Sequence, residues 1–424
     1  MQTNFNLENF IKTYVTGRQE SLLQADFEKY NSELNNRINN KKVLVIGGAG
    51  TIGSFYIKAI LKFNITKLVV VDINENGLTE LVRDLRSTTE YNIPDDFITY
   101  PVNFGDRVFE KIFRHHGPFD IVANFAAHKH VRSEKDIFSI EAMIENNVTR
   151  ARKLLDLLLE FPPEHFFCVS TDKAANPVNV MGASKKLMEE LIMAYSDRLP
   201  IKTARFANVA FSNGSLPLGF LDRLSKNQPW SCPLGIRRFF VSPQESGELC
   251  LMASIMGETG DIFFPKLDDK RDMIPFDRIA LDLLKELGLK PEIYKIEEEA
   301  RTKTTSVSSD CDDNAQEQNN LSETSAEPIK SWPIYFFGSD TSGEKSFEEF
   351  YTEKEILDND TFINLGVIKN SKKRSIAEID NIFDNLENLF KKESVTKTEI
   401  VDVLKEYLPN FEHIETGKGL DSKM

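Results

Sequence analysis

The chain has 424 residues, a formal net charge of −14 at pH 7 and a sequence pI of about 5.1. An acidic surface repels phosphate backbones and anionic headgroups, so the charge argues against nucleic-acid partners and against docking on a membrane. With 41% hydrophobic and 28% charged residues, the composition is that of a globular protein with room for a full-sized core.

The sequence shows no targeting segment, metal motif or disulfide framework. Residues 1–40 lack the apolar core of a signal peptide, and no stretch reaches the roughly 18 apolar residues that a membrane helix needs. The four cysteines, at positions 168, 232, 250 and 311, are not paired at metal-ligand spacing. We therefore expect a cytoplasmic protein in a reducing compartment, without a bound metal.

Residues 1–40 are expected to form a helical N-terminal arm. Apolar residues recur there at helical spacing, at Phe5, Leu7, Phe10, Ile11 and Tyr14 and again at Leu22, Leu23, Phe27 and Tyr30. We expect the arm to pack on the body of the protein or on a second subunit. Helices commonly form subunit interfaces, and this arm could extend one, so a homo-oligomer is expected.

From residue 41 onward, short apolar runs alternate with amphipathic stretches. Strands are expected at residues 43–46, 67–71, 97–102, 121–125, 165–169 and 201–206. Helices are expected at residues 52–63, 143–159 and 183–196. Strands that alternate with helices of this length form βαβ units, whose right-handed crossovers build a parallel sheet. The fold class predicted for residues 41–208 is therefore a doubly wound α/β sheet of the Rossmann type.

The regular alternation weakens after residue 208. Residues 209–300 and 331–370 are expected to form a smaller substrate-binding lobe. Residues 301–330 are rich in Ser, Thr, Asp, Asn and Gln, and such a composition cannot bury enough apolar surface to offset the entropy of ordering. We predict a disordered insertion there, and a helical C-terminal extension over residues 371–424.

A glycine-rich turn follows the first predicted strand. Gly47 permits the tight turn, Gly50 lets the backbone approach a pyrophosphate, and Gly53 allows the helix to pack closely on the strand. Thr51 and Ile52 open the helix whose free N–H groups and dipole favour a phosphate. This Gly-x-x-Gly-x-x-Gly spacing is the short-chain dehydrogenase variant of a dinucleotide-binding motif.

Asp72 ends the second strand about 20 residues further on, where an acidic residue binds the adenosine ribose hydroxyls. No Arg or Lys follows immediately to accept a 2′-phosphate, so NAD is favoured over NADP as the cofactor. Ala126 and Ala127, after the fourth strand, are further expected cofactor contacts. Asp106, after the third strand, is either an adenine contact or a solvated loop acid.

A second motif follows the fifth strand. It comprises Cys168-Val-Ser-Thr-Asp-Lys173 and then Asn176-Pro-Val-Asn-Val-Met-Gly-Ala-Ser-Lys185. Here the chain resembles the nucleotide-sugar 4,6-dehydratases of polysaccharide biosynthesis, which are extended short-chain dehydrogenases, and the UDP-N-acetylglucosamine 4,6-dehydratases above all. The resemblance covers about residues 41–296 and resumes at residues 343–349. Residues 124–131 and 205–209 match the same family.

Met181 stands where an ordinary short-chain dehydrogenase has the Tyr of its Tyr-x-x-x-Lys motif. A thioether cannot accept a hydroxyl proton, so the usual general base is missing. The resembling subgroup of long, configuration-retaining dehydratases also has Met here. Those enzymes usually carry N-terminal membrane segments, and none is expected within this sequence, so its substrate and pathway stay open.

The resemblance implies a reaction of three steps: oxidation of the sugar at C4 by NAD, elimination of water across C5 and C6, and return of the hydride to C6. It assigns Asp172 as the general acid and Lys173 as the general base. It further implies that Thr171 binds the sugar O4 and that Lys185 holds the nicotinamide ribose. A surface ion pair is the alternative for Asp172 and Lys173.

The resemblance also implies substrate contacts further along the chain. His128 and Lys129 follow the fourth strand, beside the expected nicotinamide, and a structural role is the alternative for His128 and the nearby His130. Asn208 is expected to meet the substrate diphosphate. Arg238 is expected either to meet it too or to be solvated.

The sequence leaves two other functions open. One is a nucleotide-sugar epimerase or C4 oxidoreductase on the same fold, which would release no water. The other is a non-catalytic NAD-binding or assembly protein, with Met181 as a sign of decay. The intact Thr171, Asp172, Lys173 and Lys185 argue against the second alternative.

Overall fold

The computed structural model describes residues 5–309, 330–338, 349–369, 371 and 373–415. Its centre is a nine-stranded sheet with the order β14-β15-β10-β6-β5-β4-β1-β2-β3. The strands are β1 (Lys42–Ile46), β2 (Lys67–Asp72), β3 (Asp96–Pro101), β4 (Ile121–Asn124), β5 (His165–Val169), β6 (Ile201–Ala204), β10 (Ile262–Pro265), β14 (Ile356–Asp358) and β15 (Leu365–Lys369).

The strands from β3 to β10 run parallel, and β15 and β14 add an antiparallel edge. The order β3-β2-β1-β4-β5-β6 is that of a doubly wound sheet, so the predicted fold class is confirmed. Strands β1, β4 and β5 are almost wholly apolar and buried, because helices cover both of their faces. The chain reverses its winding between β1 and β4, and ligands of such sheets bind outside the carboxyl ends of the strands at that point.

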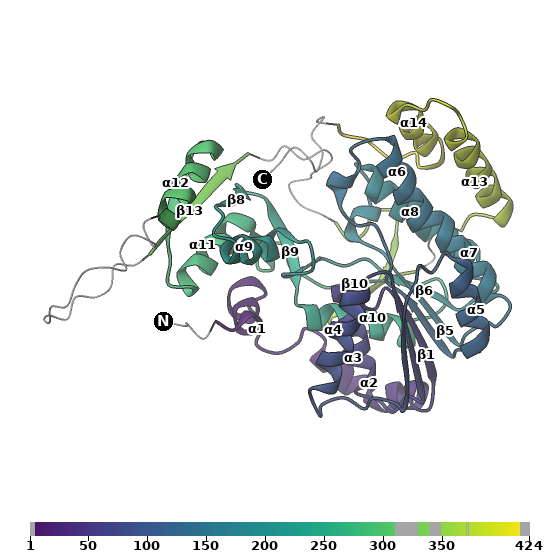
Figure 1. The fold of residues 1–424 in the computed structure, drawn as a ribbon. Coiled ribbons are helices and arrows are strands. Elements are labelled where there is room, and N and C mark those ends of the chain that lie inside the picture. The colour runs from purple at the N-terminus through teal and green to yellow at the C-terminus, as the bar shows by residue number, and fades with distance from the viewer. Residues whose placement is uncertain (1–4, 310–329, 339–348, 370, 372, 416–424) are drawn as a thin grey trace, which may run out of the picture.

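Helices lie on both faces of the sheet (Figure 1). Helices α3 (Thr51–Ile60) and α10 (Pro243–Met256) share one face, while α5 (Arg107–His116), α7 (Arg150–Leu158) and α8 (Val180–Ala194) share the other. Helix α4 (Glu75–Arg86) joins β2 to β3. The helix predicted over residues 143–159 begins earlier, as α6 (Ile137–Ile144), and reaches α7 through a π-helical turn at Glu145–Thr149.

A second lobe lies beside the main sheet (Figure 1). It contains two small sheets, with the orders β11-β9-β7 and β12-β13-β8. Its strands are β7 (Asn208–Val209), β8 (Trp230–Pro233), β9 (Arg237–Val241), β11 (Met273–Pro275), β12 (Lys290–Tyr294) and β13 (Ser331–Phe337), and its helices are α9 (Leu216–Ser225), α11 (Phe276–Glu286) and α12 (Glu297–Ser309).

The structure divides the chain differently from the predicted boundary at residue 208. Strand β10 pairs with β6, and β15 pairs with β10, so segments assigned to the lobe extend the main sheet instead. At the predicted insertion, residues 301–309 are the last part of α12. The rest of that insertion, residues 310–329, lies outside the described residues, as do residues 343–348 of the second matching stretch.

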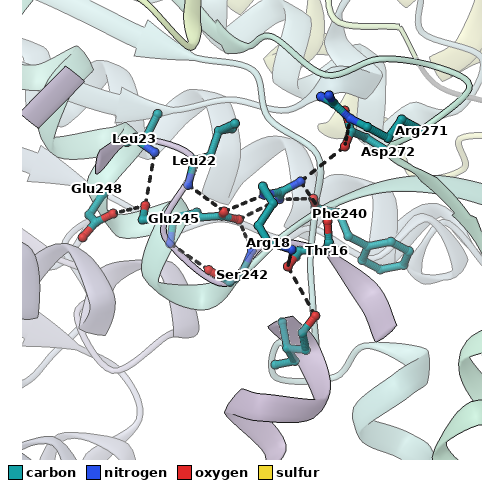
Figure 2. A network of polar contacts seen from close by, with 12 residues as sticks. Thr16, Arg18, Leu22, Leu23, Phe240, Ser242, Glu245, Glu248, Arg271 and Asp272 are labelled. Carbon is teal, nitrogen blue, oxygen red and sulfur yellow. Dashed lines mark hydrogen bonds and ion pairs between the residues drawn. The ribbon is translucent and has the colours of Figure 1, made fainter. Parts of the chain in front are cut away.

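The N-terminal arm packs on the body of its own chain. It consists of α1 (Leu7–Phe10), a π-helical turn at Ile11–Val15 and α2 (Gln24–Ile38). Figure 2 shows the connection between these helices held by Arg18, whose guanidinium donates two hydrogen bonds of 2.8 Å to the carboxylate of Glu245. Arg18 also donates to the Phe240 carbonyl and lies 3.6 Å from Asp272. The arm is thereby tied to α10 and to the β9–β11 sheet at once.

The C-terminal extension contains α13 (Ile376–Phe390) and α14 (Lys397–Tyr407), each of which begins with a capping box. It lies against the α6–α8 side of the main sheet (Figure 1). Ion pairs between Arg152 and Asp380 and between Glu190 and Arg374 fasten it there. Among the described residues, no helix has both the length and the apolar composition needed to cross a bilayer.

His165, the first residue of β5, makes stability depend on pH. Burial and the charge of Lys202, whose Nζ lies 3.2 Å from His165 Nδ1, lower the pKa of His165 to about 3. The unfolded chain binds this proton below pH 6.5 and the folded chain does not, so stability falls as pH drops from 6.5 toward 3, by about 1.4 kcal/mol per pH unit. Urea unfolding at pH 7 and pH 5 should show a smaller loss for His165→Gln than for the wild type. Equal losses of unfolding free energy in the variant and the wild type would contradict a role for His165.

Candidate active site

The glycine-rich turn connects β1 to α3 as predicted. Gly47 has φ +77°, and a Cβ there would lie 2.6 Å from the Ala126 nitrogen, so only glycine fits between the turn and the end of β4. A Cβ on Gly53 would lie 2.2 Å from the Gly47 carbonyl oxygen. Gly50 is the N-cap residue of α3, with Thr51 and Ile52 in the first turn. The turn therefore presents the helix N-terminus to a phosphate group.

Asp72 lies directly beside this turn. Its Oδ2 accepts a hydrogen bond of 2.9 Å from the Ala49 N–H, and its Oδ1 accepts one of 2.9 Å from Asn74. The carboxylate thus holds the glycine turn at the C-terminal end of β2. Asp106, in contrast, has an exposed side chain at the N-terminus of α5, and no described contact joins it to the turn.

The loop after β4 brings Ala126, Ala127, His128 and Lys129 to the same edge of the sheet. The Ala126 N–H donates to Asn124 Oδ1, and the backbone of His128 is held on both sides by the Asn147 amide. Lys129 keeps part of its surface open to solvent, yet desolvation by neighbouring atoms lowers the pKa of its ammonium. Desolvation also lowers the pKa of His128.

Asn213, in a loop of the second lobe, was not anticipated from the sequence. Its backbone N–H donates to Thr51 Oγ1 at 3.0 Å, and its carbonyl accepts a 2.8 Å hydrogen bond from Lys129 Nζ. The loop therefore bridges the start of α3 and the loop after β4. No periodic pattern marks such a residue, because its role depends on contacts between the two lobes.

Thr171, Asp172 and Lys173 follow β5 and form a hydrogen-bonded cluster. Asp172 is only 4% exposed, and its Oδ1 accepts from Thr171 Oγ1 at 2.8 Å, from the Lys173 N–H at 2.9 Å and from Lys173 Nζ at 3.0 Å. A surface ion pair was the alternative interpretation, but the carboxylate is buried. Acidic, basic and hydroxyl groups thus meet at the carboxyl end of a central strand.

Helix α8 places Met181 and Lys185 behind this cluster. Both side chains are buried, and Lys185 Nζ donates a 2.7 Å hydrogen bond to the Val169 carbonyl at the end of β5. Burial lowers the pKa of Lys185. A Cβ on Gly182 would lie 2.7 Å from the Lys173 carbonyl oxygen, so this glycine lets the first turn of α8 pack against the cluster.

Asn208 and Arg238 lie in the small sheet that β7 forms with β9. Asn208 pairs with Phe240, two residues from Arg238. The Asn208 Nδ2 is buried without a hydrogen-bond partner in the described structure, which suits a residue that awaits a ligand. Arg238 is 5% exposed, so it is not the solvated arginine of the alternative interpretation. A cavity of about 950 Å³ lies next to β9, lined in part by Asn176, Phe239 and Arg271.

A buried ionic network lies next to the site and was not predicted from the sequence. Arg205, fully buried after β6, forms charged hydrogen bonds with Glu189 of α8 and with Glu355. Burial raises the pKa of Glu189, but Arg205 and Lys186 outweigh it and lower the pKa to about 2. Glu189 Oε1 also accepts from Ser170 Oγ at 2.5 Å, next to Thr171. Arg205 lies in the stretch 205–209 that resembles the family, but nothing in the sequence paired it with Glu189.

Comparison with known proteins places these features in a family. The polysaccharide biosynthesis protein family model matches residues 43–369. The chain is 32% identical over 271 residues to an uncharacterized membrane protein of Methanocaldococcus jannaschii, which covers 62% of this chain and 78% of that protein. It is 27% identical over 239 residues to a UDP-N-acetylglucosamine 4,6-dehydratase (inverting) of Campylobacter jejuni, covering 54% of this chain and 68% of that enzyme.

A longer relative is the capsular polysaccharide biosynthesis protein CapD of Staphylococcus aureus, 26% identical over 385 residues, which cover 89% of this chain. The chain spans only 56% of CapD.

Two solved structures share the fold. Pen from Bacillus thuringiensis has a TM-score of 0.60 at 19% identity, covering 82% of this chain and 98% of that one. The UDP-glucuronic acid 4-epimerase from Bacillus cereus, solved with UDP-glucuronic acid and NAD, has a TM-score of 0.51 at 17% identity, covering 82% and 99%. These likenesses concern the fold. The family match includes the glycine turn and the Thr171–Lys185 motif, and the chain therefore belongs to the polysaccharide biosynthesis protein family.

Proposed function

We propose that the protein is an NAD-dependent nucleotide-sugar 4,6-dehydratase that acts on UDP-N-acetylglucosamine or a close analogue. The observation that carries this proposal is the buried Thr171–Asp172–Lys173 cluster at the carboxyl end of β5. Elimination of water needs an acid and a base side by side, which an ordinary oxidoreductase does not. The named 4,6-dehydratase among the relatives supports the same reaction.

The glycine turn and Asp72 fit NAD. The turn offers a helix N-terminus to the pyrophosphate, and the Asp72 carboxylate lies where the ribose hydroxyls bind. NAD bound there would accept hydride from C4 and return it to C6. Lys185 would bind the nicotinamide ribose, and Asn208 and Arg238 would bind the substrate diphosphate, as the buried unpartnered amide of Asn208 favours.

The cluster can carry every proton of this reaction without a tyrosine. Thr171 Oγ1 lies within hydrogen-bond distance of Asp172, so the O4 proton can pass through the hydroxyl to the carboxylate as C4 is oxidised. Asp172, now protonated, gives that proton to the departing C6 hydroxyl, which leaves as water. The Lys173 ammonium first releases a proton to solvent, and the free amine then removes H5 and returns that proton to C5 when hydride reaches C6. Both side chains then regain their starting protonation states, and Met181 needs no acid–base role.

A panel of nucleotide sugars, analysed by mass spectrometry, tests the proposal. The dehydratase should convert at least one UDP-sugar to a product lighter by one water. The second candidate is a nucleotide-sugar epimerase, which a 30% identical UDP-glucose 4-epimerase of Rickettsia typhi supports. An epimerase would leave the mass of the substrate unchanged, and an unchanged mass with a changed sugar configuration would replace the first proposal by the second.

Asp72 should make the protein strongly selective for NAD. A carboxylate at the ribose repels the 2′-phosphate of NADP, so we expect much tighter binding of NAD than of NADP by calorimetry. Asp72→Ser should narrow this difference, because the negative charge is gone. Asp106→Ser, an exposed acid outside the turn, is the matched control and should leave the selectivity unchanged. Equal affinities of the wild type for the two cofactors would refute the assignment.

A further inference from the structure

The C-terminal segment reaches back to the loop that precedes α8. The Glu412 N–H donates to the Pro177 carbonyl at 3.3 Å, and the Ile414 N–H donates to the Val178 carbonyl at 3.0 Å. Both hydrogen bonds are donated by the C-terminal segment to consecutive carbonyls of that loop. Pro177 and Val178 lie between Lys173 and Met181 in the chain. The segment therefore binds the backbone that connects the cluster to α8.

Glu134 links the C-terminal segment to the first residue of α8. Its side chain is 4% exposed, and its Oε2 accepts a hydrogen bond from the N–H of Val180, the first residue of α8. The first N–H groups of a helix have no partner within the helix, so the carboxylate satisfies one of them. Its negative charge also interacts favourably with the positive end of the helix dipole. Its Oε1 lies 2.8 Å from His413 Nε2 and 3.4 Å from Lys397 Nζ.

The same cluster has the ligand types of a metal site, since Glu134, His413 and Glu415 could reach one ion together. However, Lys397 Nζ already pairs with both carboxylates, and it also donates to the Glu134 carbonyl at 3.1 Å. An ammonium in contact with both acids supplies the positive charge that a metal would bring. The ammonium therefore neutralises one of the two carboxylate charges and joins the protein segments directly.

We propose that residues 412–415 act as a clamp on the segment from Thr171 to Lys185, with Glu134 and His413 as positioning residues. The inference rests on the proposed dehydratase function. The family model ends at residue 369, so the clamp lies outside the part of the chain that the match covers. Small displacements of acid and base from their reacting atoms slow a reaction sharply, and this gives the clamp its effect on rate.

The test compares His413→Ala with Asp380→Asn. The second variant breaks another contact of the C-terminal extension, with Arg152 of α7, but does not touch the Thr171–Lys185 segment. We expect His413→Ala to lower kcat roughly tenfold to hundredfold, with the KM for the nucleotide sugar and the bound NAD unchanged. His413→Gln should restore most of kcat, because its amide can still donate to Glu134. Asp380→Asn should keep the wild-type kcat.

A second measurement does not depend on the reaction. Hydrogen exchange of peptides that span residues 174–185 should become faster in His413→Ala and stay as in the wild type in Asp380→Asn. A wild type that dehydrates no sugar refutes the proposed function, while the exchange data still decide whether the clamp exists. Wild-type kcat and exchange in His413→Ala, or equal losses in both variants, would overturn the clamp.

Discussion

Replacing Lys173 by methionine is expected to stop turnover and to abolish exchange of the sugar's H5 with solvent deuterium. Methionine fills a similar volume but cannot accept a proton, and removal of H5 is the step assigned to this amine. Loss of a general base costs about a hundredfold to ten-thousandfold in rate. NAD should stay bound, because Lys173 lies in the cluster after β5, whereas the glycine turn follows β1. Mass spectrometry of the sugar in deuterated buffer measures both effects.

Asp172→Asn is the matched variant that separates the two proton transfers. The amide cannot protonate the C6 hydroxyl, so turnover should fall by a similar factor. H5 exchange should survive in part, because a C4 ketone still acidifies the proton at C5. Met181→Tyr should be tolerated or mildly harmful, since the proposed proton path contains no phenol. Full turnover together with full exchange in Lys173→Met would move the base to Lys185 or to the His128–His130 loop.

Replacing Arg205 by methionine is expected to lower the free energy of unfolding substantially. The guanidinium is fully buried between Glu189, 1% exposed, and Glu355. Its removal leaves the Glu189 carboxylate buried without its main partner, and breaking a buried pair in this way typically costs about 3–5 kcal/mol. Urea unfolding at pH 7 should show this loss. Activity should fall as well, because Glu189 holds Ser170 next to the cluster.

A double variant tests whether the unpaired Glu189 carboxylate causes the loss of stability. Arg205→Met combined with Glu189→Gln removes the stranded charge, so it should regain a large part of the lost stability. Glu355 needs no matching change, since its side chain is 16% exposed and water can solvate it. A loss below about 1 kcal/mol for the single variant, within the range of an exposed ion pair, would show that the network contributes little.

Much of the fold could be predicted from local patterns. The glycine turn, the apolar strands and the amphipathic helices each occupy short stretches of sequence, and together they specified a parallel doubly wound sheet. The placement of Gly47, Gly53 and Asp72 around one turn followed from the same motif. Asp172 and Lys173 were expected together at the end of β5 because they follow that strand directly. The edge of the sheet was not predicted, since β10 and β15 are short and irregularly spaced.

By itself the sequence determined the parallel strands from β1 to β6, the dinucleotide turn and the residues gathered after β5, because each depends on neighbours close in the chain. The tertiary structure alone decided that Asn213 bridges Thr51 and Lys129, that Arg205 pairs with Glu189 and Glu355, and that His413 meets Glu134. These contacts join residues far apart in the chain. Long-range pairs of this kind leave no periodic trace in a single sequence, because only the packing of the elements brings their charges and hydrogen-bonding groups together.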